Sequence, residues 1–219
     1  MTGSFMARIV ITREKIIEAA LASAFEKGMG ATSLADISQL LEIKKASLYN
    51  HFTSKDDILQ AVYVYCSDSL NNVRLFPEYS EEDFKATLIC AVERFILIHE
   101  RNPLYGVYVL VNTEKYFSNN VFEIYENRKN KIVDEVFLFF KTANTKGFIK
   151  NLDDENIKKK AEEFCMILFS VMDSYLLRRK EAIRKNPESG AGSLFELPSD
   201  TNELGVIKKT VGDYFDSLA

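Results

Sequence analysis

The spacing of apolar residues constrains the fold of this chain more than any other feature of its sequence. Ile16, Ala20 and Ala24 recur at four-residue steps, which places their side chains on one face of a helix. Helical periods continue over residues 80–101, 104–111, 117–141, 153–180 and 201–218. Only nine glycines and four prolines occur in 219 residues, too few for a turn-rich β fold. The sequence therefore predicts an all-α protein.

Polar residues and glycines mark the ends of the first four predicted helices. Thr12 is placed to cap the first helix and Gly28 to end it, because glycine tolerates the left-handed conformation of a helix stop. Ser33 is placed to cap a short second helix, and residues 46–52 fit a short third helix. Ser54–Asp57 resembles a capping box, which predicts the start of a long fourth helix.

The residues that most often build metal and catalytic sites are few and far apart. The two histidines are His51 and His99, and the three cysteines have neither metal-ligand nor redox spacing. We therefore expect no metal site, no cofactor and no enzymatic activity. No apolar stretch approaches the length of a membrane span or a secretory signal, which predicts a cytoplasmic protein without a membrane partner.

The distribution of charge permits a nucleic-acid partner without indicating one. The formal net charge of the whole chain is −4, and phosphate repels an acidic protein. Residues 1–60, however, hold seven Lys or Arg and seven Asp or Glu, so the excess of acidic residues lies in the rest of the chain. A neutral N-terminal part can still present a basic face.

Residues 33–52 have the pattern of a helix-turn-helix, with a tight turn at residues 42–44. Leu48 and Phe52 lie one helical turn apart and are expected to hold the second helix against the first. The outer face of that helix should carry polar side chains that can donate hydrogen bonds in the major groove. These are Lys44, Lys45, Ser47 and Asn50. Any hairpin of two helices can look similar, so a helical adaptor that binds proteins instead of DNA is an alternative.

The same region resembles the DNA-binding signature of the TetR family of transcriptional regulators, over about residues 8–60. The segments that carry the resemblance are Gly28–Ser33, Ile37, Leu41–Phe52 and Ser54–Ile58. The resemblance implies a helix-turn-helix domain of three helices over residues 1–56. It also implies a larger helical domain over residues 57–219 that binds a ligand and dimerises. It favours DNA binding over the adaptor alternative.

Two groups of side chains are expected to contact DNA. The first group donates to phosphates, as hydroxyl, imidazole and ammonium groups do, and comprises Ser33, Lys44, Tyr49, His51 and Lys55. The second group comprises the candidates for base contacts, Lys45, Ser47 and Asn50. Lysine can donate to guanine, and asparagine can form two hydrogen bonds with adenine. Arg8 is a further candidate, as a flexible arm that reaches a phosphate or the minor groove.

The chain departs from the family signature at two positions of the turn. Glu42 stands where the family has glycine, so this residue must adopt either a conformation that is tolerable without glycine or a modestly strained one. Lys44 stands where a serine or threonine cap is common, which leaves the next helix without its usual side-chain acceptor. Both departures concern the geometry of the turn.

The function that the resemblance implies is a homodimeric repressor that binds a palindromic operator and is released by a small molecule. Ligand binding would shift the helix that begins near Asp57 and so change the distance between the two recognition helices. The last two helices, about 155–185 and 201–218, are expected to form a four-helix bundle with their counterparts. Their apolar stripes are Phe164, Leu168, Val171 and Tyr175, and Ile207, Val211, Tyr214 and Phe215.

Aromatic residues in the second domain suggest a cavity for an apolar, planar or aromatic ligand, although many aromatics simply fill cores. The residues predicted to line it are Tyr105, Tyr108, Phe117, Phe122, Tyr125, Phe164, Phe169 and Met172. Asp173 and His99 are candidates to orient a polar group of the ligand. For His99, a hydrogen bond to the last carbonyls of its helix is the favoured interpretation.

Overall fold

The computed structural model describes residues 10–77, 82–185 and 197–219, and these residues form helices and no strand. Their all-α architecture confirms the predicted fold class. The helices are α1 (Arg13–Lys27), α2 (Leu34–Leu40), α3 (Lys45–Leu48), α4 (Lys55–Asn71), α5 (Phe84–His99), α6 (Leu104–Glu114), α7 (Asn119–Thr145), α8 (Asp154–Lys185) and α10 (Thr201–Asp216). No helix in the described ranges is long and apolar enough to cross a membrane.

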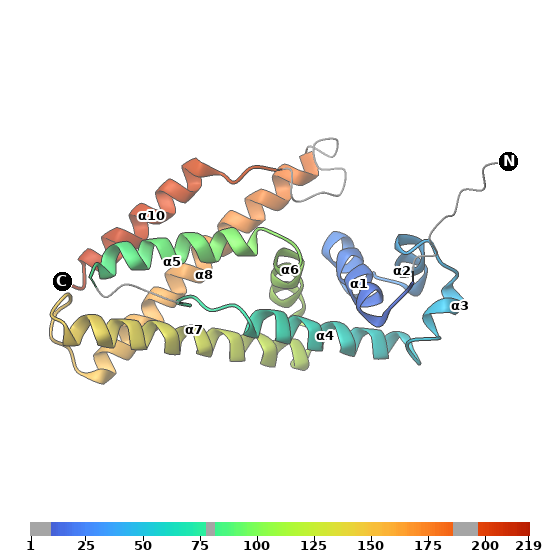
Figure 1. The fold of residues 1–219 in the computed structure, drawn as a ribbon, viewed down its shortest axis with the longest axis horizontal. Coiled ribbons are helices and arrows are strands. Elements are labelled where there is room, and N and C mark those ends of the chain that lie inside the picture. Colours follow the sequence, from blue (N-terminus) through green and yellow to red (C-terminus); the bar gives the residue numbers. More distant parts are fainter. Residues whose placement is uncertain (1–9, 78–81, 186–196) are drawn as a thin grey trace.

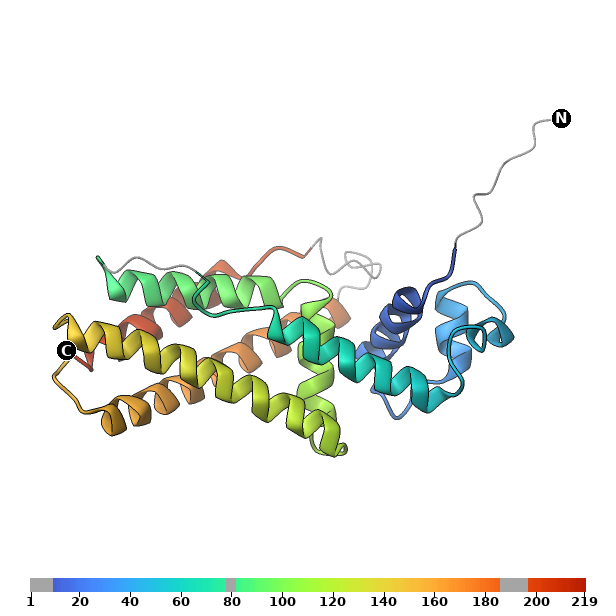
Figure 2. The same cartoon turned by 60° about the horizontal axis from the view of Figure 1, so that its bottom comes forward.

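The molecule is elongated, with two ends of different construction (Figures 1 and 2). Helices α1, α2 and α3 gather at one end, which we call the head. Helices α5, α7, α8 and α10 form the other end, which we call the body. Helix α4 runs from the head toward the body, and α6 lies between them (Figure 1). Within the body α7 packs along α8, and α10 packs along α5.

Most helix starts follow the caps predicted from the sequence. Thr12 caps α1 and Ser33 caps α2, where Asp36 completes a capping box. The Ser54 hydroxyl accepts from the Asp57 N–H at 3.0 Å, as predicted. The Asp57 carboxylate, however, accepts from the N–H of Thr53 instead of the N–H of Ser54, so the box is displaced by one residue.

Helix α5 begins later than the predicted start at residue 80. Asp83 is its cap, with the carboxylate 2.9 Å from the Ala86 nitrogen. Residues 80 and 81 lie outside the described residues. The spacing of apolar residues therefore predicted the helix correctly. The position of its first residue, however, depended on which polar side chain formed the cap.

Two apolar cores hold the molecule together, and one of them extends from the head into the body. The head core contains Leu48 and Phe52 together with Ile58 and Val62 of α4. It also contains buried side chains from outside the head, which are Val107, Leu110 and Val111 of α6 and Val121 of α7. Each of these aliphatic groups stabilises the contact by about 1.5–3 kcal/mol when it is fully buried. Helices α4 and α6 therefore couple the head to the body.

The apolar stripes predicted to form a dimer interface lie mostly in the core of the single chain, which corrects that prediction. Phe164, Leu168 and Tyr175 of α8 are buried, and so are Ile207, Val211 and Phe215 of α10. The helical period shows which residues share a face, but it cannot show whether the same chain or a second subunit covers that face. The large apolar side chains that α8 and α10 leave exposed are Met166, Leu177 and Val206.

Candidate DNA interface and ligand cavity

The helix-turn-helix of the head consists of α2, a four-residue turn and the short helix α3. Glu42 has a φ of 54°, the left-handed conformation expected where the family signature has glycine. Backbone hydrogen bonds hold this turn, because the N–H of Glu42 donates to the Gln39 carbonyl and the N–H of Ile43 donates to the Ser38 carbonyl. Lys44 provides no side-chain cap for α3, as predicted from its chemistry.

The helical turn that follows α3 carries the predicted inner face. Hydrogen bonds from the N–H groups of Asn50 and His51 to carbonyls three residues earlier continue the turn to Phe52. Leu48 and Phe52 are 1% and 2% exposed, which confirms that they anchor this segment. The helix itself is shorter than the predicted 46–52, since these last residues form turns instead of α-helix.

The structure brings the residues predicted to contact DNA to one end of the molecule. Lys44, Lys45, Tyr49 and Asn50 are exposed, and Ser47, His51 and Lys55 are half-buried. Ser33 is different, because its hydroxyl donates to the Asp36 carboxylate at 2.6 Å and its N–H donates to the same group. The donors of Ser33 are therefore occupied within the capping box.

Arg13 holds the recognition turn against α1, a role that the sequence analysis did not identify. Its guanidinium carbon lies 4.0 Å from the centroid of the Phe52 ring, and its Nη1 donates to the His51 carbonyl. At the opposite end of α1, Lys27 pairs with Asp36 at 2.6 Å, and this ammonium group is the main cause that lowers the pKa of the Asp36 carboxyl. No sequence pattern links Arg13 to the recognition turn, because the contact spans 38 positions.

A cavity of about 410 Å³ lies in the body, among α4, α5, α6, α7 and α8. This volume is within the range of small-molecule sites, about 300–1,000 Å³. Apolar side chains of all five helices form much of its wall, namely Leu70, Phe95, Val111, Ile132, Phe169 and Met172. Tyr116 and Asp173 also line it and are exposed, so the cavity reaches the surface beside them.

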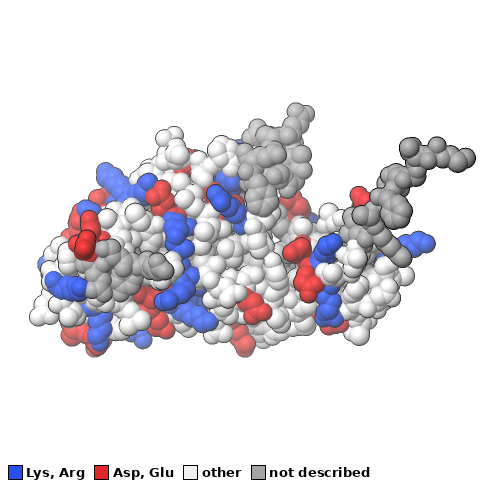
Figure 3. Space-filling view, viewed as in Figure 1, with Lys and Arg blue, Asp and Glu red and all other residues white. Residues whose placement is uncertain are grey.

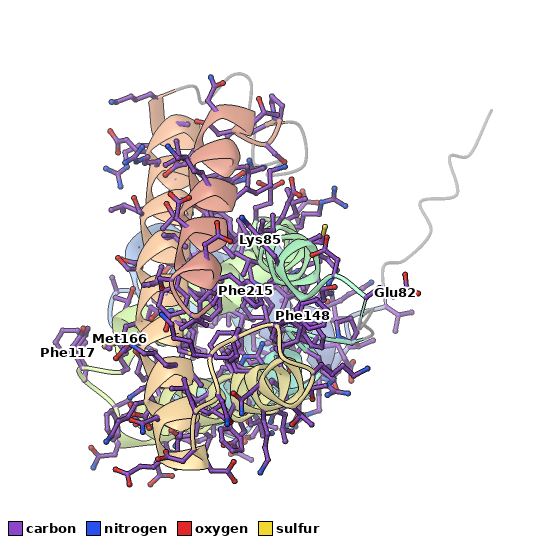
Figure 4. All side chains as sticks on the ribbon, turned by 90° about the vertical axis from the view of Figure 1, so that its left-hand side faces the viewer. Glu82, Lys85, Phe117, Phe148, Met166 and Phe215 are labelled. Atoms are coloured by element: carbon purple, nitrogen blue, oxygen red, sulfur yellow. The ribbon has the colours of Figure 1, made fainter. Side chains whose placement is uncertain are left out.

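Four of the eight residues predicted to line a ligand cavity do so: Tyr108, Tyr125, Phe169 and Met172. Tyr105 and Phe164 belong to the body core instead, and the Tyr105 hydroxyl donates to the Leu176 carbonyl. Phe122 is exposed, and Phe117 is 81% exposed and projects away from the helices (Figure 4). Aromatic content alone cannot distinguish these positions.

His99 and Asp173, the two polar candidates from the sequence, both line the cavity. The Nδ1 of His99 lies 2.7 Å from the Phe95 carbonyl, which is the predicted bond to its own helix. Because a carbonyl only accepts, Nδ1 carries the proton of this bond. Burial lowers the pKa of His99 to about 4, so the imidazole is neutral at pH 7.

Basic side chains in the cavity wall were missed by the sequence analysis. Arg128 and Lys129 of α7 and Lys115 after α6 line the cavity, with Asp173 as the acidic residue of the wall. The Lys115 ammonium lies 3.7 Å from the centroid of the Tyr125 ring and donates to the Asn112 side chain. The wall is thus more basic than the apolar wall expected from the sequence.

The N-terminal sequence matches the family model described as bacterial regulatory proteins of the tetR family, over residues 16–62. This match covers α1 to the first half of α4, which is the helix-turn-helix and its supporting helices. Residues 16–62 therefore form a DNA-binding domain of the TetR family. The chain is accordingly a DNA-binding transcriptional regulator, as the resemblance in its sequence implied.

Named relatives extend the similarity beyond the head. It is 28% identical over 166 residues to the biofilm operon icaADBC HTH-type negative transcriptional regulator IcaR of Staphylococcus aureus, covering 76% of this chain and 83% of IcaR. It is 26% identical over 218 residues to the HTH-type transcriptional regulator TtgR of Pseudomonas putida, covering 94% of this chain and 91% of TtgR.

A solved structure supports the fold over both head and body. A putative TetR-family transcriptional regulator from Syntrophomonas wolfei superposes with a TM-score of 0.62 at 16% identity. The superposition covers 94% of this chain and 96% of that protein. At this identity the similarity concerns the fold, and the chemistry of the cavity must be argued from the side chains of this chain.

Charged residues of both signs are mixed over the face seen in Figure 3, at the head as well as over the body. This agrees with the balanced count of basic and acidic residues in the N-terminal part. On the face seen in Figure 3, the head therefore shows a mixture of charges and not a broad positive field.

Proposed function

We propose that this chain is a homodimeric repressor that binds a palindromic operator through its head and is released by a small molecule in the body cavity. The observation that carries the proposal is that α4 and α6 each take part in both regions. Both helices contribute side chains to the head core, and both contribute side chains to the cavity wall. The name of IcaR, a negative transcriptional regulator, supports repression instead of activation.

Helix α6 offers one route from the cavity to the head. Its Tyr108 faces the cavity, while a Cβ placed on Gly106 would lie 3.4 Å from Leu21 of α1. The Glu114 carboxylate, at the end of α6, accepts a hydrogen bond at 3.2 Å from the N–H of Met29, which lies directly after α1. A displacement of α6 by a ligand would therefore change contacts on α1.

Helix α4 offers a second route, because the segment after it is fastened to α7. The Val73 carbonyl accepts from Arg128 Nη1 at 2.7 Å. The N–H groups of Leu75 and Phe76 donate to the Glu135 carboxylate at 2.9 and 3.1 Å. A ligand that displaces α7 would move the end of α4, whose other end supports the head.

We assign contacts with DNA to those head residues whose side-chain donors are at least partly exposed. Tyr49, His51, Lys44 and Lys55 donate to phosphates, and Lys45, Ser47 and Asn50 contact bases. Ser33 contributes by holding the start of α2, since its own donors are occupied. The domain boundary proposed after residue 56 separates the DNA-contacting part of the chain from the ligand-binding part. The head core, however, includes residues beyond this boundary.

The proposed dimer forms through the outer faces of α8 and α10. Leu177 and Val206 are large apolar side chains exposed on these helices, and a second subunit would cover them. A Val206→Glu variant should therefore be monomeric in sedimentation at concentrations where the wild type is a dimer. Val64→Glu, the same change at a valine of α4 that is 61% exposed, is the matched control for the added charge. Equal dimerisation of the wild type and Val206→Glu would contradict this interface.

The proposed function is tested by selecting bound duplexes from a random DNA pool with the full chain. The expected result is a palindrome, because a symmetric dimer reads two equal half-sites. Tyr49→Ala should lose binding to the recovered sequence, whereas Tyr116→Ala, at a tyrosine outside the head that is 77% exposed, should keep it. Recovery of no enriched sequence, or equal binding by both variants, would contradict the proposal.

A further inference from the structure

One guanidinium in the cavity wall has a hydrogen-bond donor that the protein does not use. Arg128 is 7% exposed, and its Nη1 donates to the Val73 carbonyl at 2.7 Å. Its Nη2 is buried and has no hydrogen-bond partner among the described residues. A buried charged donor without an acceptor is strongly unfavourable, so this atom is suited to an acceptor from outside the chain.

Within the described part of the chain Arg128 forms no direct ion pair, and the nearby carboxylate of Glu135, which binds the N–H groups of Leu75 and Phe76, acts on its charge without contact. None of the ion pairs formed there includes Arg128, whereas Lys129 is 3.4 Å from the Glu126 carboxylate. The Phe95 ring centroid lies 5.3 Å from its guanidinium carbon, which supplies a cation–π contact but no negative charge. Burial lowers the pKa of Arg128 to about 10, so the group remains charged at pH 7.

The remaining wall limits the chemistry of an occupant. Three basic side chains and one acidic side chain line the cavity, which favours a negatively charged ligand. The apolar surfaces of Phe95, Phe169 and Met172 favour a ligand with an apolar body. Lys129 is paired with the Glu126 carboxylate and Asp173 offsets a second positive charge, so one of the three positive charges of the wall remains to be balanced. This matches a group with a single negative charge better than a doubly charged phosphate.

We propose that the ligand of this cavity is an amphipathic carboxylate, whose carboxylate accepts from Arg128 Nη2 and whose apolar body packs on Phe169 and Met172. This inference rests on the proposed function, because it assigns the chemical class of the small molecule that releases DNA. Charge-assisted hydrogen bonds of this kind are about twice as strong as neutral ones. The carboxylate therefore provides selectivity, and the apolar body provides most of the buried area.

Matched pairs of carboxylates and primary amides test the inference on the full chain without DNA. The probes are 2-naphthoate, indole-3-acetate and decanoate, each with its own amide, titrated by calorimetry at low salt. At least one carboxylate should bind about tenfold or more tightly than its amide, which corresponds to about 1.4 kcal/mol. In the Arg128→Met variant this ratio should fall to about one.

Lys131→Gln is the matched control for the loss of one charge. Lys131 is exposed on the same helix, donates to Asn71 beside the end of α4 and does not line the cavity. This variant should keep the preference for the carboxylate. If Arg128→Met fails to fold, the inference is still tested by the ratio of carboxylate affinity to amide affinity. This ratio is then compared between the wild type and Arg128→Lys, which keeps the charge.

Three results would overturn the inference: no carboxylate of the panel binds at millimolar concentration, the amides bind equally well, or Arg128→Met keeps the preference. Operator binding is measured separately on the ligand-free protein. A wild type that binds its operator but shows no carboxylate preference contradicts this inference alone. A wild type that binds no operator contradicts the proposed function, whatever it binds in the cavity.

Discussion

The head and the body place their charged groups in opposite environments. In the head Lys44 and Lys45 are exposed to water, and the segment that carries them is fixed by the buried Leu48 and Phe52. In the body Arg128 is buried in a cavity wall, and one of its buried donors has no hydrogen-bond partner among the described residues. Exposed charges contribute modest, salt-dependent attraction, whereas a buried charge discriminates strongly between ligands. The head is therefore suited to a long polyanion and the body to one small anion.

The largest expected effect is a loss of stability when the buried aromatic residue of the recognition segment is replaced. Replacing the exposed aromatic residue should have little effect on stability. Phe52→Ala should destabilise the protein by about 3–5 kcal/mol, because it leaves a cavity in the head core and removes the ring beneath Arg13. Tyr49→Ala, at a position 53% exposed, should change the free energy of unfolding by less than about 0.5 kcal/mol. Urea denaturation measures both. Equal losses of stability would show that Phe52 does not anchor the segment.

A second prediction uses pH to test burial in the body. The pKa of His99 is lowered from 6.5 to about 4 in the folded chain, so the unfolded chain binds the proton more readily. The contribution of neutral His99 to the free energy of unfolding is complete above about pH 6.5 and is lost as the pH falls to about 4. It amounts to about 3 kcal/mol. Denaturation from pH 7 to 4 measures it.

The control for this pH dependence is the other histidine of the chain. His99→Gln should remove the part of the acid destabilisation that belongs to His99, whereas His51→Gln should leave that part in place. An unchanged dependence of unfolding free energy on pH in His99→Gln would mean that His99 is hydrated in the native state.

The third prediction concerns base contacts of the head. Asn50→Ala and Lys45→Ala should each weaken discrimination at one base pair of each half-site, by about 1–3 kcal/mol for a good pair of hydrogen bonds. Binding to operators with single base changes measures this. If both variants keep the wild-type profile, other side chains such as Lys44 and Ser47 read the bases.

The smallest expected effect is that of a phosphate contact. Lys55→Ala should weaken binding to every sequence alike and reduce the dependence of log K on log salt concentration by about 0.9. Lys146→Ala, which removes a lysine at the end of α7 in the body, is the control for net charge. A changed sequence preference in Lys55→Ala would assign Lys55 to base contacts instead.

The two regions also differ in how much of each could be predicted from the sequence. The caps Thr12 and Ser33 and the anchors Leu48 and Phe52 depend on neighbours within a few residues, so local patterns identified them. Arg128 stands in a polar stretch of α7 that resembles a solvated face. Its burial depends on the segment after α4, to which it is bonded across 55 positions.

Aromatic residues of the second domain also show what local sequence patterns cannot predict. Phe117 and Tyr125 lie on the same predicted helix, yet Phe117 is exposed and Tyr125 lines the cavity. The helical period assigns residues to faces, but the partner of each face is set by tertiary packing. The basic character of the cavity followed only once the helices were assembled.

The central claim is that one molecule binds either the ligand or the operator well, and reciprocal titration tests it most directly. The carboxylate that binds most tightly is added at saturation to the protein–operator complex, and its own affinity is measured with and without DNA. The account predicts that ligand weakens operator binding by about 5–150-fold and that DNA weakens ligand binding by the same factor. Unchanged operator affinity at saturating ligand would contradict it.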